Sequence, residues 1–449
     1  MTDQLLRRPR LSSHRALTRT LAANCTARVL AIVGVSLASI LVARVGGPEA
    51  VGTYALLRIL PGLLGVLCVL GLPGSMSYFL GPTYRDDPRL WPTVMSILAG
   101  GSVVALLVWV ALAHTLQKTF FGGDTTTVIA AGGAAVVTQL VLTVSKTSLQ
   151  GLGDRRGGDV VIAAEELAFL PAYAAVLALG LSGTLAMIVG LVLADVAVAA
   201  DGWRRVARNL GWRRLGIAAA PRGWWGRPRP RLAAEITVFG SKGQLGGMIT
   251  LLNLRLDFAI LGALAGPAVL GAYAVASKYA EILRLPGTAL TWVTYPDFAG
   301  MEADRAFARA RRMVVPALLC FTVAVGPLLL LAGPVIGLLY GSDFHDAVTP
   351  ARILLLGMLL SGAAGVASGF LYGRGRPGLN SLALALGLVV TTVLDVLLIP
   401  RFGAVGAAYA SMIAYLVSDG ALTLMLLRHR SGSRALPAGE PFASPAASQ

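Results

Sequence analysis

Ionisable residues inside long apolar stretches are the side chains of this sequence that are most clearly suited to binding a ligand or an ion. Arg28 and Arg58 occupy such stretches, and neither has an acidic residue three or four positions away. A charge at the centre of a membrane costs roughly 2.5–3.5 kcal/mol on insertion scales, so it usually faces water, a partner or a ligand. Guanidinium groups hold oxyanions through two parallel hydrogen bonds. The pattern therefore predicts anion binding, although an ion pair with another helix would explain both residues too.

Three lysines add to these candidate cations. Lys278 has an acidic residue three positions later, so a ligand site and a local ion pair explain it equally well. Lys242 has Glu235 two turns before it, and the sequence leaves open whether it pairs with this acid or with a ligand. Lys146 is predicted to form a structural salt bridge with the adjacent acids at 165–166.

Four aspartates inside apolar stretches are candidates for coupling transport to Na⁺ or H⁺. They are Asp195, Asp257, Asp395 and Asp419. Asp195 has no cation nearby and is the leading candidate, although a hydrogen bond to Ser or Thr explains it equally well. Asp257 follows, because Arg255 at two positions away on a helix does not face it.

Catalytic and metal-binding patterns are not found. The four histidines are far apart and lack the cysteine or carboxylate spacing of a metal site. There is no P-loop for ATP. The sequence therefore predicts a protein that is not an enzyme and has no cofactor or metal other than a coupling ion.

The composition requires a membrane environment for these charges. Of 449 residues, 56% are hydrophobic and 13% charged, at a mean hydropathy of +0.72, whereas soluble proteins carry about 25% charged residues. The net charge of +16 lies in short clusters between apolar runs rather than along one face. This placement argues against a nucleic-acid partner.

Stretches of about 20 apolar residues cross a membrane as helices, and the sequence contains twelve. Their ranges are 21–43, 51–80, 90–114, 126–152, 159–180, 184–203, 233–264, 268–297, 313–338, 350–372, 377–400 and 404–427. With the N-terminus inside, the inner segments hold 27 Lys and Arg, and the outer loops hold four when Arg352 at the outer end of the tenth span is counted with them. This asymmetry predicts that both termini face the cytoplasm.

The two halves of the chain repeat each other. Residues 47–55 (GPEAVGTYA) match residues 266–274 (GPAVLGAYA) at an offset of 219, and Asp195 and Asp419 correspond at an offset of 224. Six spans in each half make the repeat parallel, as in some transporters. Arg58 and Lys278 fall at nearly equivalent positions.

This repeat predicts an all-α integral membrane protein, with two pseudo-symmetric six-helix bundles, 21–203 and 233–428, around a central cavity. A basic cytoplasmic linker, 204–232, would join them, either as a helix on the membrane surface or as a loop. The segment 1–20 is expected in the cytoplasm, as is a disordered tail at 429–449.

Five segments resemble one known family in order and spacing. The chain is similar to bacterial oligosaccharide flippases of the multidrug/oligosaccharidyl-lipid/polysaccharide exporter superfamily from about residue 20 to 428. The segments are ILVARVGGPEAVGTYALL, GLPGSMSYFLG, LDFAILGALAGPAVLGAYAVASKYAEIL, TYPDFAG and LDVLLIPRFGAVGAAYASMIAYL.

The resemblance implies export of a polyprenyl-pyrophosphate-linked glycan, a surface polysaccharide precursor, across a bacterial cytoplasmic membrane by alternating access. It implies that Arg28, Arg58 and Lys278, with Lys242 as a fourth cation, hold the pyrophosphate. Membrane lipids and polysaccharide assembly enzymes are the expected partners.

The resemblance leaves other functions open. Twelve spans also fit a multidrug or small-molecule cation antiporter of the same superfamily. A lipid II flippase is another alternative, although those flippases typically have two further helices. A non-transporting scaffold is a further alternative. A glycan polymerase or ligase would need a larger outer loop than the dozen or so residues near 114–125 and 339–349.

Overall fold

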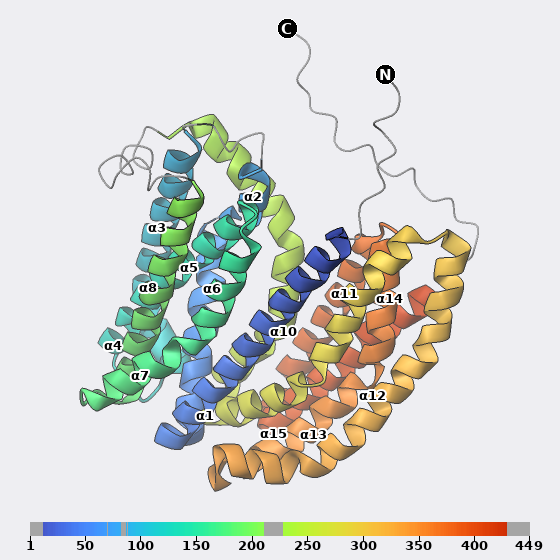
Figure 1. Cartoon of the computed structure of the whole chain (residues 1–449). Helices are drawn as coiled ribbons and strands as arrows, with labels where there is room; N and C mark the ends of the chain where they lie inside the picture. Colours follow the sequence, from blue (N-terminus) through green and yellow to red (C-terminus); the bar gives the residue numbers. More distant parts are fainter. Residues whose placement is uncertain (1–11, 70, 82–86, 88, 211–227, 429–449) are drawn as a thin grey trace. The chain divides into compact units, whose positions relative to one another are not determined.

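The computed structural model describes residues 12–69, 71–81, 87, 89–210 and 228–428, and every regular element within them is a helix (Figure 1). The first half contains α1 (Ser12–Cys68), α2 (Leu72–Phe79), α3 (Leu90–Phe120), α4 (Thr126–Ala131), α5 (Gly133–Gly151), α6 (Arg155–Leu167), α7 (Phe169–Ala178) and α8 (Gly183–Asn209). The second half contains α10 (Pro230–Glu281), α11 (Arg284–Gly300), α12 (Ala303–Tyr340), α13 (Val348–Gly357), α14 (Ser361–Gly373) and α15 (Pro377–Leu427). Short 3₁₀ turns at Ser342–Ala347 and Met358–Leu360 flank α13.

Nine helices of the described chain are long and apolar enough to cross a membrane. Some exceed one crossing: α15 has 51 residues, about 77 Å of helix against a hydrocarbon core of about 30 Å. The backbone turns inside α1, α10 and α15 at glycines with positive φ, which are Gly47 (68°), Gly266 (83°) and Gly403 (53°). The helical segments on the two sides of these turns match six predicted spans, and the segment after Gly266 continues through α11 to complete its span. The described helices therefore accommodate all twelve predicted spans. The all-α membrane fold is confirmed.

The helices divide into two compact units. Unit 1 comprises residues 1–248, 258–274 and 339–343, and unit 2 comprises the remaining residues. The start of α10 therefore belongs with unit 1, whereas the sequence assigned the whole stretch from 233 to the second bundle. Its packing explains this: the Gly240 backbone lies directly against that of Gly71, and the ring of Phe239 stacks on Tyr78 at 4.5 Å. The predicted tail and most of the predicted linker lie outside the described residues.

The two repeated turns meet each other inside unit 1. A Cβ added at Gly52 would overlap the carbonyl group of Pro267, and one added at Gly271 would overlap that of Pro48. The contact is reciprocal, because the residues correspond at the repeat offset of 219. Proline suits the first turn of the following helix, and glycine permits both the positive φ before it and the close backbone approach after it.

Unit 1 places α6 along α1. A Cβ at Gly34 of α1 would lie 3.0 Å from the Cβ and the carbonyl carbon of Glu166, so the helices approach closely at the end of α6. The fifth predicted span then breaks at Ala168, and α7 follows with Pro171 in its first turn. Phe169 and Tyr173 of α7 stack at 5.1 Å. Glu166 consequently occupies a fixed backbone position at a break within a membrane span.

Candidate functional site

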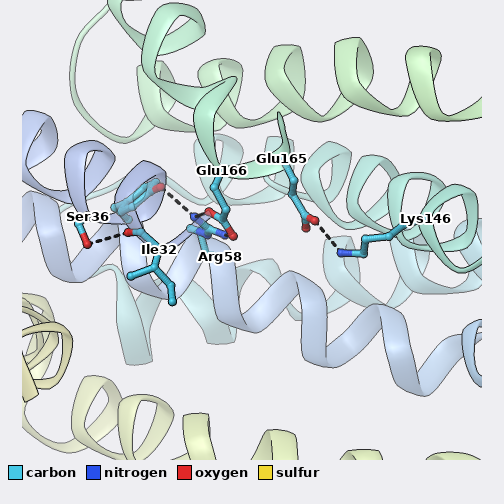
Figure 2. A network of polar contacts seen from close by, with 7 residues as sticks. Ile32, Ser36, Arg58, Lys146, Glu165 and Glu166 are labelled. Atoms are coloured by element: carbon cyan, nitrogen blue, oxygen red, sulfur yellow. Dashed lines mark hydrogen bonds and ion pairs between the residues drawn. The ribbon is translucent and has the colours of Figure 1, made fainter. Parts of the chain in front are cut away.

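Arg58 is held by an ion pair within unit 1. Its two terminal nitrogens donate to the two carboxylate oxygens of Glu166, at 2.5 Å from Nη1 and 2.7 Å from Nη2. Nη1 also donates to the hydroxyl of Tyr54 at 3.2 Å. Figure 2 shows the side chain of Arg58 on α1 against the carboxylate of Glu166 on α6. The interhelical ion pair that the sequence left open is therefore present.

The Arg58–Glu166 pair lies beside an aromatic cluster but is not sealed. Tyr54 is fully buried, and its ring contacts Phe169 at 4.8 Å between centroids. The side chains of Arg58 and Glu166 remain 25% and 18% exposed. Because a charged pair on the lipid face is unfavourable, this exposed edge is expected to face water.

Glu165, the neighbour of Glu166, points to a different cation. Lys146 of α5 donates to Glu165 Oε2 at 2.6 Å, and Figure 2 shows the two carboxylates diverging from the end of α6. The predicted salt bridge of Lys146 is confirmed with Glu165. The two cations and two acids balance in charge.

Arg28 has a different environment. Its Nε donates to Asn24 Oδ1 at 3.0 Å, and the Asn24 amide donates to Asp159 Oδ1 at 2.6 Å. Asp159 is buried at the start of α6, whereas Arg28 is exposed. Among the described residues no carboxylate contacts Arg28 directly, so its terminal nitrogens are available to a ligand.

The other two candidate cations, Lys278 and Lys242, are both on α10. Lys278 is half-buried in α10 and belongs to unit 2. Lys242 lies on α10, but its side chain is outside the described residues. Unit 1 thus contributes the two arginines, and the roles of the lysines remain predictions.

Asp195 makes the hydrogen bond that was the alternative to a coupling role. Thr138 of α5 donates to its carboxylate at 3.0 Å. In unit 2, Ser361 donates to Asp419 at 2.7 Å. The hydroxyls correspond at an offset of 223 and the carboxylates at 224. The same hydroxyl–carboxylate pair, between the fourth and sixth spans of each half, therefore occurs in both units.

A pair of acids, Asp257 and Asp395, lies in unit 2. Asp257 accepts a hydrogen bond from Ser411 at 3.5 Å, and Asp395 accepts one from Thr391 at 3.4 Å. The two buried carboxylates interact electrostatically. Asp395 Oδ1 is buried without a hydrogen-bond partner in the described part of the chain. Two carboxylates and two hydroxyls are oxygen ligands of the kind that a hard cation takes.

Several of these contacts were not predicted from the sequence. Asn24, Tyr54 and Thr138 are ordinary residues of apolar helices when taken singly, and Asp159 stands at the edge of a predicted span. The one available signal was spacing, since Asp159 and Glu166 are seven positions apart and therefore share a helix face. Without a fold, that face had no known neighbour.

Long apolar helices, buried ionisable pairs and a doubled arrangement define a multi-pass membrane protein built from two related halves. Two comparisons with known proteins agree. A family described as polysaccharide biosynthesis protein matches residues 40–349. A probable low-salt glycan biosynthesis flippase of Haloferax volcanii, Agl15, is 26% identical over 167 residues, which is 36% of this chain and 35% of that protein. The alignment thus spans about a third of that relative.

Solved structures support the same fold. The lipid II flippase MurJ in an inward closed conformation superposes with a TM-score of 0.72 at 13% identity, covering 91% of this chain and 87% of MurJ. An inward-facing multidrug resistance MATE transporter of the MOP superfamily gives 0.66 at 12% identity, covering 90% and 94%.

The chain belongs to the polysaccharide biosynthesis protein family, whose match covers more than half of its length. Its fold is that of the MurJ and MATE structures. The resemblance found in the sequence is confirmed.

Proposed function

We propose that this protein is a flippase that moves a polyprenyl-diphosphate-linked glycan across the bacterial cytoplasmic membrane by alternating access, with both termini in the cytoplasm. Family membership over residues 40–349 is the observation that carries this proposal. The named flippase Agl15 among the relatives agrees with it. The diphosphate would bind Arg28 and Arg58, with Lys278 and Lys242 as further cations, while the polyprenyl chain stays in lipid.

The two arginines suit a diphosphate because each retains unused N–H donors. In the described residues, Arg28 donates hydrogen bonds only from its Nε. Arg58 donates from its two terminal nitrogens, Nη1 and Nη2, which form the end-on edge of the guanidinium group. Charge-assisted bidentate hydrogen bonds are the strong form of phosphate recognition.

Depletion of the protein in its own host tests this function. Lipid extracts analysed by mass spectrometry should show accumulation of a polyprenyl-diphosphate-linked glycan, and expression of the wild-type chain should reverse it. An unchanged pool of lipid-linked glycans after complete depletion would remove the basis of the proposal.

We further propose that a monovalent cation, Na⁺ or H⁺, drives the cycle at the Asp257–Asp395 pair of unit 2. Its support is the buried carboxylate oxygen of Asp395 that has no hydrogen-bond partner in the described residues. Asp195 is the weaker candidate for coupling, because its hydrogen bond from Thr138 is shorter, 3.0 Å, than the bonds of 3.4 and 3.5 Å to Asp395 and Asp257. Transport by reconstituted protein should then depend on a Na⁺ or pH gradient, and replacement of both aspartates by Asn should abolish that dependence.

A cation antiporter is the second candidate, favoured by the neutralisation of Arg58 by Glu166. An antiporter would exchange a cationic dye for Na⁺ or H⁺ in proteoliposomes. Gradient-driven dye transport that polyprenyl diphosphate does not inhibit would favour the antiporter, whereas the flippase should show diphosphate binding without dye transport.

A further inference from the structure

Two acids on one face of helix α6 reach the two candidate arginines of unit 1, Arg58 directly and Arg28 through Asn24. Asp159 and Glu166 are seven residues apart, which is two turns, and both side chains meet α1. Glu166 binds Arg58 directly, and Asp159 binds the Asn24 amide that in turn accepts from Arg28. One helix thus sets the orientation of two guanidinium groups.

A count of the N–H donors of Arg58 shows which edge of its guanidinium group makes no hydrogen bond to the described residues. A guanidinium has five N–H donors in a fixed plane. Glu166 takes one from each terminal nitrogen, and Tyr54 takes the second of Nη1. The remaining donors are Nε–H and the second hydrogen of Nη2, and no described residue accepts from them. They lie side by side, so Arg58 presents a free side-on edge.

Arg28 is arranged in the complementary way. Asn24 accepts from its Nε, which leaves the end-on edge of both terminal nitrogens free within the described structure. Asp159 fixes which way the Asn24 amide points, because the amide NH₂ donates to it at 2.6 Å. The Asn24 oxygen is then the atom turned toward Arg28.

We propose that Asp159 and Glu166 are positioning residues that aim the free edges of Arg28 and Arg58 at the diphosphate of the substrate. This inference rests on the proposed function and assigns α6 a role in recognition of the headgroup. Seven residues of helix span about 10 Å. The rise along α6 from Asp159 to Glu166 is therefore comparable with the length of a diphosphate plus a hydrogen bond of about 2.8 Å at each end.

The chain offers a matched control for Glu166. Glu165 is its neighbour with the same charge and a similar exposure, 24% against 18%, but its partner is Lys146. E165Q therefore removes a carboxylate from the same helix end without touching either arginine. A general effect of charge loss or of a weakened helix end would appear in E165Q as well as in E166Q.

The test measures binding of polyprenyl diphosphate and polyprenyl monophosphate to the full-length protein in nanodiscs. E166Q is expected to weaken diphosphate binding about tenfold, equivalent to about 1.4 kcal/mol, and E166D to recover part of the loss. Monophosphate binding should change by less than about threefold in E166Q, because one phosphate needs only one edge. E165Q should stay within about twofold of wild type for both ligands.

E166Q removes the charged partner of Arg58 and could therefore prevent folding. A second variant, D159A, keeps the test decisive in that case. D159A frees the Asn24 amide but leaves no buried cation, since Arg28 is exposed. It is expected to lose diphosphate preference with an unchanged melting temperature. Tighter diphosphate binding in E166Q, or binding equal to E165Q in both variants, would overturn the positioning role.

Failure of the proposed function gives a different pattern. If R28K and R58K lose diphosphate binding while E166Q and D159A keep it, the arginines bind substrate and only the role of α6 is wrong. If the wild-type protein does not bind polyprenyl diphosphate at all, the proposed function and the positioning role are both refuted.

Discussion

The reciprocal contact of Gly52 with Pro267 and of Gly271 with Pro48 can be opened by single methyl groups. Alanine at either glycine would place a Cβ against the opposing carbonyl group, and the amide nitrogen of the other glycine would be 3.0 Å away. These are backbone atoms, so no flexible side chain can yield. Overpacking costs about 1–3 kcal/mol, and a rigid contact belongs in the upper half of that range. A cost of about 2–3 kcal/mol lowers the population of the closed contact roughly 30- to 160-fold.

Cysteine labelling on the opposite turn measures this opening. Thr53 and Ala272 are buried next to the contact and correspond at the repeat offset. In a chain with Cys25, Cys68 and Cys320 replaced by Ser, G52A should raise the labelling rate of a cysteine at Ala272 by a membrane-impermeant maleimide. G271A should do the same for a cysteine at Thr53.

The control is G100A, because a Cβ at Gly100 of α3 meets no atom within 4 Å. It should leave both labelling rates unchanged. Rates that stay within about twofold of the parent in both G52A and G271A would show that the contact yields without opening.

Three further outcomes follow from the site and the topology. R58K should weaken polyprenyl diphosphate binding at least tenfold in a nanodisc titration, because an ammonium cannot pair with Glu166 and a phosphate through two planar edges; equal affinity would exclude a bidentate role. D257N should make transport by proteoliposomes indifferent to an imposed Na⁺ or pH gradient, whereas a retained dependence would place coupling elsewhere. A cysteine at Arg401 should react with an impermeant reagent added to intact cells and one at Arg311 should not, and the reverse pattern would invert the predicted topology.

The fold could be predicted largely because the membrane restricts what a chain can do. Backbone groups in hydrocarbon must be satisfied internally, so apolar stretches of sufficient length become helices. The Gly-Pro pairs at 47–48 and 266–267 marked where two spans join, and the structure has positive φ at both glycines. The division into units was less accessible, because the place of 233–248 depends on a backbone contact at Gly240 that no periodicity reveals.

For the charged residues, too, the sequence determined some properties and the tertiary structure determined others. The sequence by itself determined that Arg28, Arg58 and Asp195 lie in membrane spans, that the halves repeat, and that the chain resembles the family to which it belongs, because these follow from local composition and order. Only the tertiary structure decided that Glu166 pairs with Arg58, Glu165 with Lys146 and Thr138 with Asp195. The physical reason is that an intramembrane charge must be satisfied by some group in space. The hydropathy of the sequence shows that a charge lies within a span and must have a partner. Helix packing determines which of several distant residues is that partner.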